Sequence, residues 1–221
     1  MRNLLSLDGV LFTVLGYPMS SLEFFATTLN LLGVWLMTRR NIWTWPVSIV
    51  AVVLLGLVFY RIRLYSDLLE QGYYLATSVW GWWLWRREGA SSAERGAGVP
   101  VRWNSPTTNF LLAAGICAAS LCAGRFMTGI HDYFPAFFPA PASYPYLDAG
   151  TTVVSLVAQI LMAQRRIECW VLWLAVDAVS VALYARKGVV FISLLYLIFL
   201  GLAFKGLREW RAVREVVESP R

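Results

Sequence analysis

The sequence has few of the residue types on which enzymes rely. It contains one histidine, three cysteines and only 14% charged residues. Neither H-E-x-x-H nor G-x-S-x-G occurs, and Cys117, Cys122 and Cys169 form no C-x-x-C pair. The histidine, His131, falls in a predicted outer loop. These absences argue against metal, redox, acid–base and nucleophilic chemistry, so we expect no enzyme activity, no cofactor and no metal site.

Apolar residues are abundant instead: 58% of the chain is hydrophobic, and the mean hydropathy is +0.59. A helix needs roughly 17–25 apolar residues to cross a bilayer, and a barrel strand would show ~10 residues of alternating polarity. The nearly uncharged runs are Phe24–Thr38, Asn41–Tyr60, Gln71–Trp85, Ser105–Gly124, Ala149–Gln164, Cys169–Ala185 and Gly188–Phe204. We therefore predict an all-α membrane protein with seven transmembrane helices.

Basic residues are distributed unevenly between the two sides of this predicted topology. With the N-terminus outside, 13 of the 19 Lys and Arg residues fall on one side and 6 on the other. Cytoplasmic loops are enriched in Lys and Arg, which predicts a cytoplasmic C-terminus. The net charge of +6 then follows from topology and indicates no nucleic-acid partner. Residues 1–19, too short to span, are expected to lie at the membrane interface.

Two parts of the sequence resemble each other. Shifting the chain by 125 positions aligns Leu22–Arg86 with Leu147–Arg211 without a gap. Matched residues that are not merely apolar carry most weight; they include Arg40/Arg165, Trp45/Trp170, Arg61/Arg186, Gly81/Gly206, Trp85/Trp210 and Arg86/Arg211. This similarity predicts two repeats of three helices each.

The predicted organisation is 3+1+3. Residues 20–86 form repeat 1, residues 87–146 hold a loop, the linker helix Thr107–Gly124 and the outer loop His131–Tyr146, and residues 147–211 form repeat 2. Residues 212–221 are a cytoplasmic tail. Because the single linker helix restores the orientation, the repeats are parallel, as in SWEET-type sugar transporters, whose substrate lies between the repeats near the midplane.

Asp177 is the most informative residue, because it lies in the middle of the apolar run Cys169–Ala185. By membrane-insertion scales, a charged carboxylate at this depth costs on the order of several kcal/mol, which makes Asp177 a functional candidate. It could pair with Arg125, relay protons, or balance a polar or cationic solute, and we favour the solute. Val52 occupies the equivalent position of repeat 1, which predicts one asymmetric site.

Polar and aromatic residues recur at helical spacing on four of the predicted helices. Ser, Thr and Asn also hydrogen-bond between membrane helices, and Trp gathers at membrane interfaces, so packing and the interfacial belt are alternative explanations. Aromatic planes beside an acid suit a flat cation. The faces are Glu23, Thr27 and Asn30; Asp148, Thr152, Ser155 and Gln159; Gln71, Tyr74, Ser78 and Trp82; and Trp170, Trp173, Asp177, Ser180 and Tyr184.

Two groups of motifs resemble the PnuC-type nicotinamide riboside transporters, over almost all of Leu22 to Trp210. The first comprises Trp45-Pro46, Leu64-Tyr65-Ser66-Asp67, Gln71, Tyr74, Gly81-Trp82 and Trp85. The second comprises Leu161-Met162, Arg165, Glu168, Trp170, Trp173, Asp177 and Leu195-Tyr196-Leu197. The resemblance implies a SWEET-like homo-oligomer in the bacterial inner membrane that takes up nicotinamide riboside by facilitated diffusion.

This resemblance also implies roles for individual residues. Trp173 and Tyr74 would stack on the nicotinamide ring, and Gln71 would bond the carboxamide or a hydroxyl. Asp177 would accept from ribose or balance the ring charge, and Tyr196 would close the site. The full predicted substrate site is Asn30, Trp45, Gln71, Tyr74, Ser78, Trp82, Trp173, Asp177 and Tyr196. A SWEET-type sugar carrier, or a carrier of another nucleoside or vitamin, is the alternative.

Overall fold

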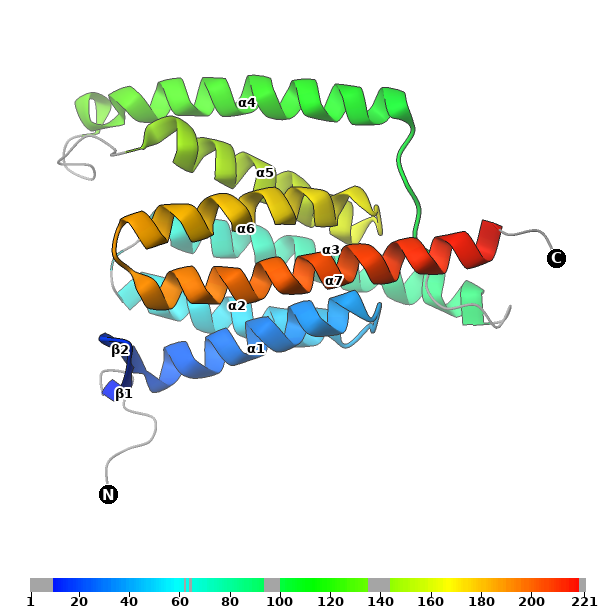
Figure 1. Cartoon of the computed structure of the whole chain (residues 1–221), viewed down its shortest axis with the longest axis horizontal. Helices are drawn as coiled ribbons and strands as arrows, with labels where there is room; N and C mark the ends of the chain where they lie inside the picture. Colours follow the sequence, from blue (N-terminus) through cyan, green and yellow to red (C-terminus); the bar gives the residue numbers. More distant parts are fainter. Residues whose placement is uncertain (1–9, 62, 64, 94–99, 135–143, 219–221) are drawn as a thin grey trace.

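The computed structural model describes residues 10–61, 63, 65–93, 100–134 and 144–218. Within these residues the chain forms a short hairpin followed by seven helices (Figure 1). Residues 1–9 of the predicted interfacial segment and 135–143 of the predicted outer loop lie outside the described residues. The elements are β1 (Val10–Val14), β2 (Tyr17–Ser20), α1 (Ser21–Thr38), α2 (Thr44–Arg61), α3 (Tyr65–Ala93), α4 (Pro106–Tyr133), α5 (Pro145–Ala163), α6 (Glu168–Arg186) and α7 (Val190–Glu218).

Five of the described helices are long and apolar enough to cross a membrane: α2, α4, α5, α6 and α7. The other two, α1 and α3, carry more polar residues, among them Glu23, Asn30 and Glu70. The protein is therefore a helical, multi-pass membrane protein. Its seven helices agree in number with the seven predicted spans.

Several predicted boundaries were wrong, because an apolar run ends at the first charge whereas the helix continues past it. Helix α4 continues past Gly124 to Tyr133, so His131 lies in its last turn and not in a loop. Helix α3 begins at Tyr65 and runs to Ala93, into the predicted cytoplasmic loop. Helix α7 extends to Glu218, so most of the predicted tail is helical. Helices that project beyond a bilayer tolerate charge at their ends.

Six helices form a ring, and the seventh lies outside it. Contacts join α1 to α2, α2 to α3, α3 to α5, α5 to α6, α6 to α7, and α7 back to α1. Helix α4 packs against α5 on the outer side of the bundle (Figure 1). The hairpin lies at one end of the ring, which we call the hairpin end. The opposite end, where the C-terminus lies, is the tryptophan end.

A cluster of four tryptophans fills the tryptophan end of the ring: Trp45, Trp85, Trp170 and Trp210, each at most 1% exposed. Their rings meet edge to face, with centroids 5.4 Å apart in the Trp45–Trp85 and Trp170–Trp210 pairs. These are the distances at which aromatic pairs attract. We call this group the tryptophan cluster.

Two hydrogen bonds and two glycines hold the tryptophan cluster in place. The Trp85 indole N–H donates to the carbonyl of Ala163 at 3.0 Å, and the Trp210 N–H donates to that of Met37 at 3.2 Å. Each bond joins α1–α3 to α5–α7. Trp45 lies directly on Gly81, and Trp170 lies on Gly206, where a Cβ atom would collide with the indole.

The short segment 100–105 covers the α5–α6 connection at the tryptophan end. Its backbone pairs with that connection through Arg102 N–H to Arg165 O at 3.2 Å and Ile167 N–H to Arg102 O at 3.1 Å. The Glu168 carboxylate accepts from the Asn104 backbone N–H at 2.7 Å and from the Asn109 amide at 3.1 Å. We call residues 100–105 the strap.

The N-terminal hairpin was not predicted from the sequence. Its two-residue turn, Leu15-Gly16, has positive φ at both positions, 49° and 83°, which matches the twist of paired strands. Ser20 then caps α1 in a capping box with Glu23. The Tyr17 ring stacks on Phe191 of α7 at 5.2 Å, so the hairpin covers the junction of α1 and α7.

Candidate substrate-binding cavity

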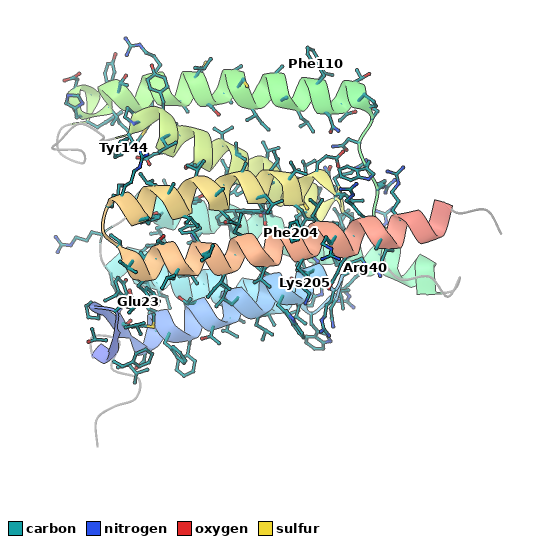
Figure 2. The ribbon with its side chains drawn as sticks, viewed as in Figure 1. Glu23, Arg40, Phe110, Tyr144, Phe204 and Lys205 are labelled. Atoms are coloured by element: carbon teal, nitrogen blue, oxygen red, sulfur yellow. The ribbon has the colours of Figure 1, made fainter. Side chains whose placement is uncertain are left out.

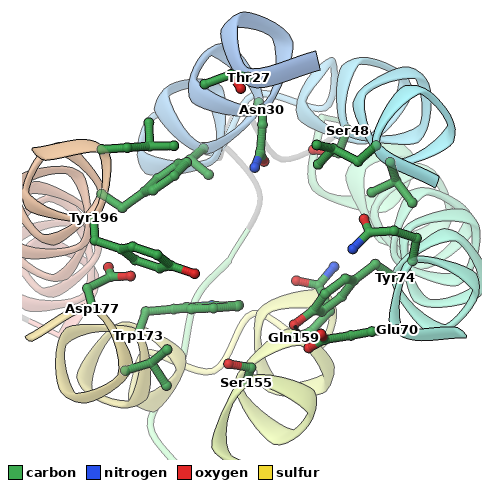
Figure 3. Close-up of a pocket in the computed structure, with 18 of the residues that line it drawn as sticks. Thr27, Asn30, Ser48, Glu70, Tyr74, Ser155, Gln159, Trp173, Asp177 and Tyr196 are labelled. Carbon is green, nitrogen blue, oxygen red and sulfur yellow. Dashed lines mark hydrogen bonds between the residues drawn. The ribbon is translucent and has the colours of Figure 1, made fainter. Parts of the chain in front are cut away.

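The ring of six helices encloses a cavity of about 580 Å³ (Figure 3). Its lining comes from all six ring helices and from β2. All predicted site residues except Trp82 line it: Asn30, Trp45, Gln71, Tyr74, Ser78, Trp173, Asp177 and Tyr196. Each face predicted from helical spacing therefore contributes to one space, although Asp148, Thr152 and Ser180 of those faces do not line it.

Trp82 does not line the cavity, although it shares a helix face with Gln71 and Ser78. It packs against the hydrophobic core, and the Arg86 guanidinium lies 5.9 Å from its ring. Trp82 lies too deep in the bundle to line the cavity. The Trp45 indole packs on Gly81 and ends the cavity above the level of Trp82.

The cavity has layers that follow from helix geometry. At 1.5 Å per residue, Tyr74 and Asp177 each lie about 14 Å from the hairpin ends of α3 and α6. Ser78 and Trp173 lie one turn deeper, at about 20 Å. Helices α3 and α6 line the cavity from separate walls, so each pair marks one level of it (Figure 3).

Asp177 is 4% exposed and projects toward the cavity beside Trp173 and Tyr196 (Figure 3). Within the described residues it forms no ion pair. The sequence also allowed a salt bridge to Arg125. That guanidinium instead donates to Thr128 at 3.1 Å on its own helix, α4, outside the ring. The structure therefore removes the salt-bridge interpretation of Asp177.

Three further carboxylates line the cavity: Glu23, Asp67 and Glu70. Glu70 lies about 8 Å into α3 and accepts a hydrogen bond from the Tyr74 hydroxyl at 2.9 Å. Glu70 was not predicted from the sequence, because the predicted span began at Gln71, directly after this charge. None of the described residues that line the cavity is Lys, Arg or His. The described lining therefore holds four carboxyl groups and no basic side chain.

At the hairpin end, the mouth of the cavity is bordered by Tyr17, Met19 and Glu23. The Tyr17 hydroxyl donates to Glu23 Oε1 at 3.0 Å. Burial, then this hydrogen bond and the negative charge of Glu23, raise the pKa of Tyr17 to about 12. Tyr17 therefore stays protonated even above pH 10, and its hydrogen bond joins the hairpin to α1.

Amides and hydroxyls complete the lining. Asn30 of α1 and Gln159 of α5 project into the cavity, and Ser155 lies near Glu70 and Tyr74 (Figure 3). Tyr184 and Tyr196 stack at 5.5 Å on the α6–α7 side. One wall of the cavity is thus aromatic with one acid, and the facing wall is rich in hydrogen-bonding groups.

Side chains cover the two ends of the bundle unequally. Basic side chains gather near the tryptophan end, as around Arg40 and Lys205, whereas Glu23 marks the hairpin end (Figure 2). Arg39 lies over the Trp35 ring at 4.1 Å and Lys205 at 5.9 Å. We call Arg39, Arg40 and Lys205 the basic belt; they lie near the tryptophan end of the bundle.

A sequence model of the nicotinamide mononucleotide transporter family matches residues 20–212. The chain belongs to this family. The match includes all six ring helices and the linker helix α4, up to residue 212 of α7. Since the family consists of transporters, the protein is a membrane transporter and not an enzyme.

Individual transporters are similar to this protein over most of the chain. The nicotinamide riboside transporter PnuC of Escherichia coli (strain K12) is 29% identical over 214 residues, 88% of this chain and 87% of PnuC. The riboflavin/roseoflavin transporter RibM of Streptomyces davaonensis is 29% identical over 172 residues, 78% of this chain and 76% of RibM. Relatives with the same degree of identity thus bear the names of different vitamins.

The fold has a counterpart among solved structures. The crystal structure of the vitamin B3 transporter PnuC superposes with a TM-score of 0.66 at 24% identity, over 90% of this chain and 84% of that one. This likeness supports the fold of the bundle. The chemistry of the cavity has to be read from the residues of this chain.

Proposed function

We propose that this protein carries nicotinamide riboside across the bacterial inner membrane by facilitated diffusion. The observation that carries the proposal is the cavity itself: aromatic rings beside Asp177, with four carboxylates and no basic residue among the described lining. Nicotinamide riboside has a flat ring with one positive charge and a ribose with several hydroxyls. The aromatic wall with Asp177 suits the charged ring, and the facing wall of hydrogen-bonding groups suits the ribose.

The carboxylates of the cavity also favour the riboside over its phosphorylated form. A phosphate at ~8 Å from one carboxylate is repelled by about 2 kcal/mol per unit charge at an effective dielectric of 20. The cavity holds Glu70 and Asp177 on separate walls and has no guanidinium or ammonium to compensate. We infer that the mononucleotide, a flavin or a neutral sugar binds more weakly than the riboside.

The residues have the following roles in this proposal. Trp173 and Tyr196, which flank Asp177, hold the pyridinium ring, and Asp177 balances its charge. Tyr74, held by Glu70, stands at the same depth on the α3 wall and contacts the other side of the substrate. Gln71 and Asn30 hydrogen-bond the ribose. Trp45 closes the cavity beneath the substrate.

We further propose that the two halves are parallel repeats, with residues 20–86 as repeat 1 and 147–211 as repeat 2, joined through residues 87–146. Residues that line the cavity occur in pairs 125 positions apart, which supports a common ancestry. The pairs include Asn30/Ser155, Met37/Met162, Trp45/Trp170, Ser48/Trp173, Val52/Asp177, Phe59/Tyr184, Gln71/Tyr196 and Ser78/Ala203. Asp177 against Val52 makes the single site asymmetric.

The proposed orientation places the hairpin end outside and the tryptophan end in the cytoplasm. The basic belt near the tryptophan end supports it, because cytoplasmic surfaces are enriched in Lys and Arg. In this orientation the cavity is closed toward the cytoplasm by the tryptophan cluster. We also propose a homo-oligomer, supported by the largely exposed helix α4, in whose apolar 18-residue segment only 6% of residues are buried.

The test is uptake of labelled nicotinamide riboside into proteoliposomes, with and without competitors. Unlabelled riboside should compete, whereas the mononucleotide, riboflavin and glucose should not at equal concentration. Asp177→Asn should weaken binding about 10- to 100-fold, because a contact between opposite charges at ~4 Å is worth up to ~4 kcal/mol at a dielectric of 20.

The matched control is Asp148→Asn, which removes the same charge from an exposed position in the first turn of α5. It should leave affinity unchanged. Equal affinity of wild type and Asp177→Asn would remove Asp177 from the site. Competition by glucose or riboflavin at least as strong as by the riboside would replace the proposed substrate.

A further inference from the structure

The basic belt lies where helices α1 and α7 meet, near the tryptophan end (Figure 2). Two of its cations contact the same ring. The Arg39 guanidinium, at the end of α1, lies 4.1 Å from the centre of the Trp35 ring, and the Lys205 ammonium of α7 lies 5.9 Å from it. Trp35 is not among the described residues that line the cavity. Cations from the two halves of the chain thus meet at one indole.

Positive charge exceeds negative charge at this junction. The Glu209 carboxylate, one turn further along α7, lies 3.7 Å from the Lys205 ammonium and offsets one charge. Arg39 and Arg40 supply two more positive charges, and Arg39 is exposed. An anion placed beside Arg39 and Lys205 is therefore attracted by both.

The corresponding junction in the other half of the bundle, between α3 and α5, differs at these positions. A shift of 125 residues gives the pairs Trp35/Ile160, Arg39/Gln164 and Trp80/Lys205. Arg40 does have a basic counterpart, Arg165, but that residue is 1% exposed. A general enrichment of basic residues at the cytoplasmic side does not explain why Arg39 and Lys205 face one junction and have no counterparts at the other.

An exposed apolar surface continues from these cations toward the hairpin end. Leu32 lies three residues before Trp35 on α1, and Gly201 and Ile198 lie four and seven residues before Lys205 on α7, spacings that keep each set on one helix face. All three are exposed. A Cβ atom at Gly201 would have no atom within 4 Å, so α7 leaves open space there. The surface extends about 10 Å from Lys205 to Ile198, along the direction in which lipid chains lie.

We propose that Arg39 and Lys205 bind the phosphate group of an anionic phospholipid, whose acyl chains lie along this apolar surface. A guanidinium donates two parallel hydrogen bonds to a phosphate, and an ammonium adds a compact charge. Long basic side chains near helix ends extend to the level of the lipid headgroups. The apolar surface favours a lipid over free phosphate. The bound lipid would join α1 to α7 beside the hydrogen bond from Trp210 to Met37.

The test is native mass spectrometry of the purified full-length protein, titrated in detergent with phosphatidylglycerol or phosphatidylcholine. Each basic residue near an anionic lipid contributes about 5-fold in affinity, so wild type should bind phosphatidylglycerol about 5- to 30-fold more tightly than phosphatidylcholine. Arg39→Gln and Lys205→Gln should each reduce this preference about 5-fold. Arg39→Lys keeps the charge and should retain most of it.

Arg87→Gln is the matched control. Its guanidinium lies 5.3 Å from the ring of Trp83, four residues earlier on α3, so it repeats the contact of Arg39 with Trp35 away from the α1–α7 junction. It should leave the lipid preference intact. An unchanged preference in both Arg39→Gln and Lys205→Gln, or an equal loss in Arg87→Gln, would overturn the inference.

Inorganic phosphate distinguishes the two sources of a phosphate group. Added at the concentration of the lipid, it should not displace phosphatidylglycerol, and displacement would overturn the lipid as the ligand of this site. Melting curves of each variant in the same detergent identify any loss of binding that comes from unfolding.

Discussion

Replacing Gly206 by alanine tests how tightly the closed end of the cavity is packed. A Cβ atom at this position would lie 2.6 Å from Cζ2 of Trp170, whereas ordinary contacts are 3.4–4 Å. The indole is closely packed, since Trp170 is 1% exposed and lies edge to face on Trp210 at 5.4 Å, so it can shift only toward the cavity that it borders. Overpacking of this kind costs about 1–3 kcal/mol.

The alanine also gains helix propensity, which offsets up to about 1 kcal/mol. Because the ring is held on both sides, we take the upper end of the overpacking range and expect Gly206→Ala to destabilise the protein by about 2 kcal/mol. For a chain of this size, 1 kcal/mol corresponds to about 2–4 °C in melting temperature. Thermal unfolding in detergent, followed by tryptophan fluorescence, should therefore show a decrease of about 4–8 °C.

Gly201 provides the control on the same helix. It is exposed, and a Cβ there would have no atom within 4 Å. Gly201→Ala should therefore raise the melting temperature slightly, through the gain of about 0.4–1 kcal/mol from a less flexible unfolded chain. A melting temperature of Gly206→Ala equal to or above that of wild type would refute the packing argument.

Three further substitutions test other contacts. Trp85→Phe leaves the Ala163 carbonyl without its donor and should destabilise the protein by about 1–3 kcal/mol, measured as a lower melting temperature; an unchanged value would exclude a contribution from this bond. Glu168→Ala releases the strap at Asn104, so trypsin should cleave after Arg102 faster than in wild type, and equal rates would show that the carboxylate does not hold the strap. Tyr17→Phe removes one phenol with a pKa of about 12, two units above its ordinary value, so the difference in tyrosinate absorbance should appear near pH 12. Because this pKa is raised, the stability it reflects is present below pH 10 and lost as the pH rises through 12; ionisation near pH 10 would contradict the buried hydrogen bond.

The sequence predicted the number of the described helices and eight of the residues that line the cavity, largely from periodicity. A span of apolar residues and a face repeating every three to four residues are local properties, so Tyr74, Trp173 and Asp177 could be placed on inward faces before any tertiary contact was known. The repeated glycines and tryptophans were also visible. The packing of each tryptophan ring against a glycine could not be predicted, because it depends on which helix lies opposite.

What the sequence did not predict depends on burial and on contacts between distant segments. Glu70 was treated as the boundary of a span, whereas α3 continues past it and its carboxylate is held by Tyr74 inside the ring. Trp82 has the right periodicity but the wrong depth, because Trp45 closes the cavity first. The hairpin escaped notice since its turn, Leu15-Gly16, has one residue that rarely adopts positive φ.

The two hydrogen bonds of the tryptophan cluster have a consequence for motion. Trp85 of α3 is tied to the end of α5, and Trp210 of α7 is tied to the end of α1, so the bonds cross between the halves of the chain. The two halves can separate at this end only when both hydrogen bonds break. Any movement that opens the tryptophan end toward a substrate in the cavity therefore has to break contacts on both α1 and α5.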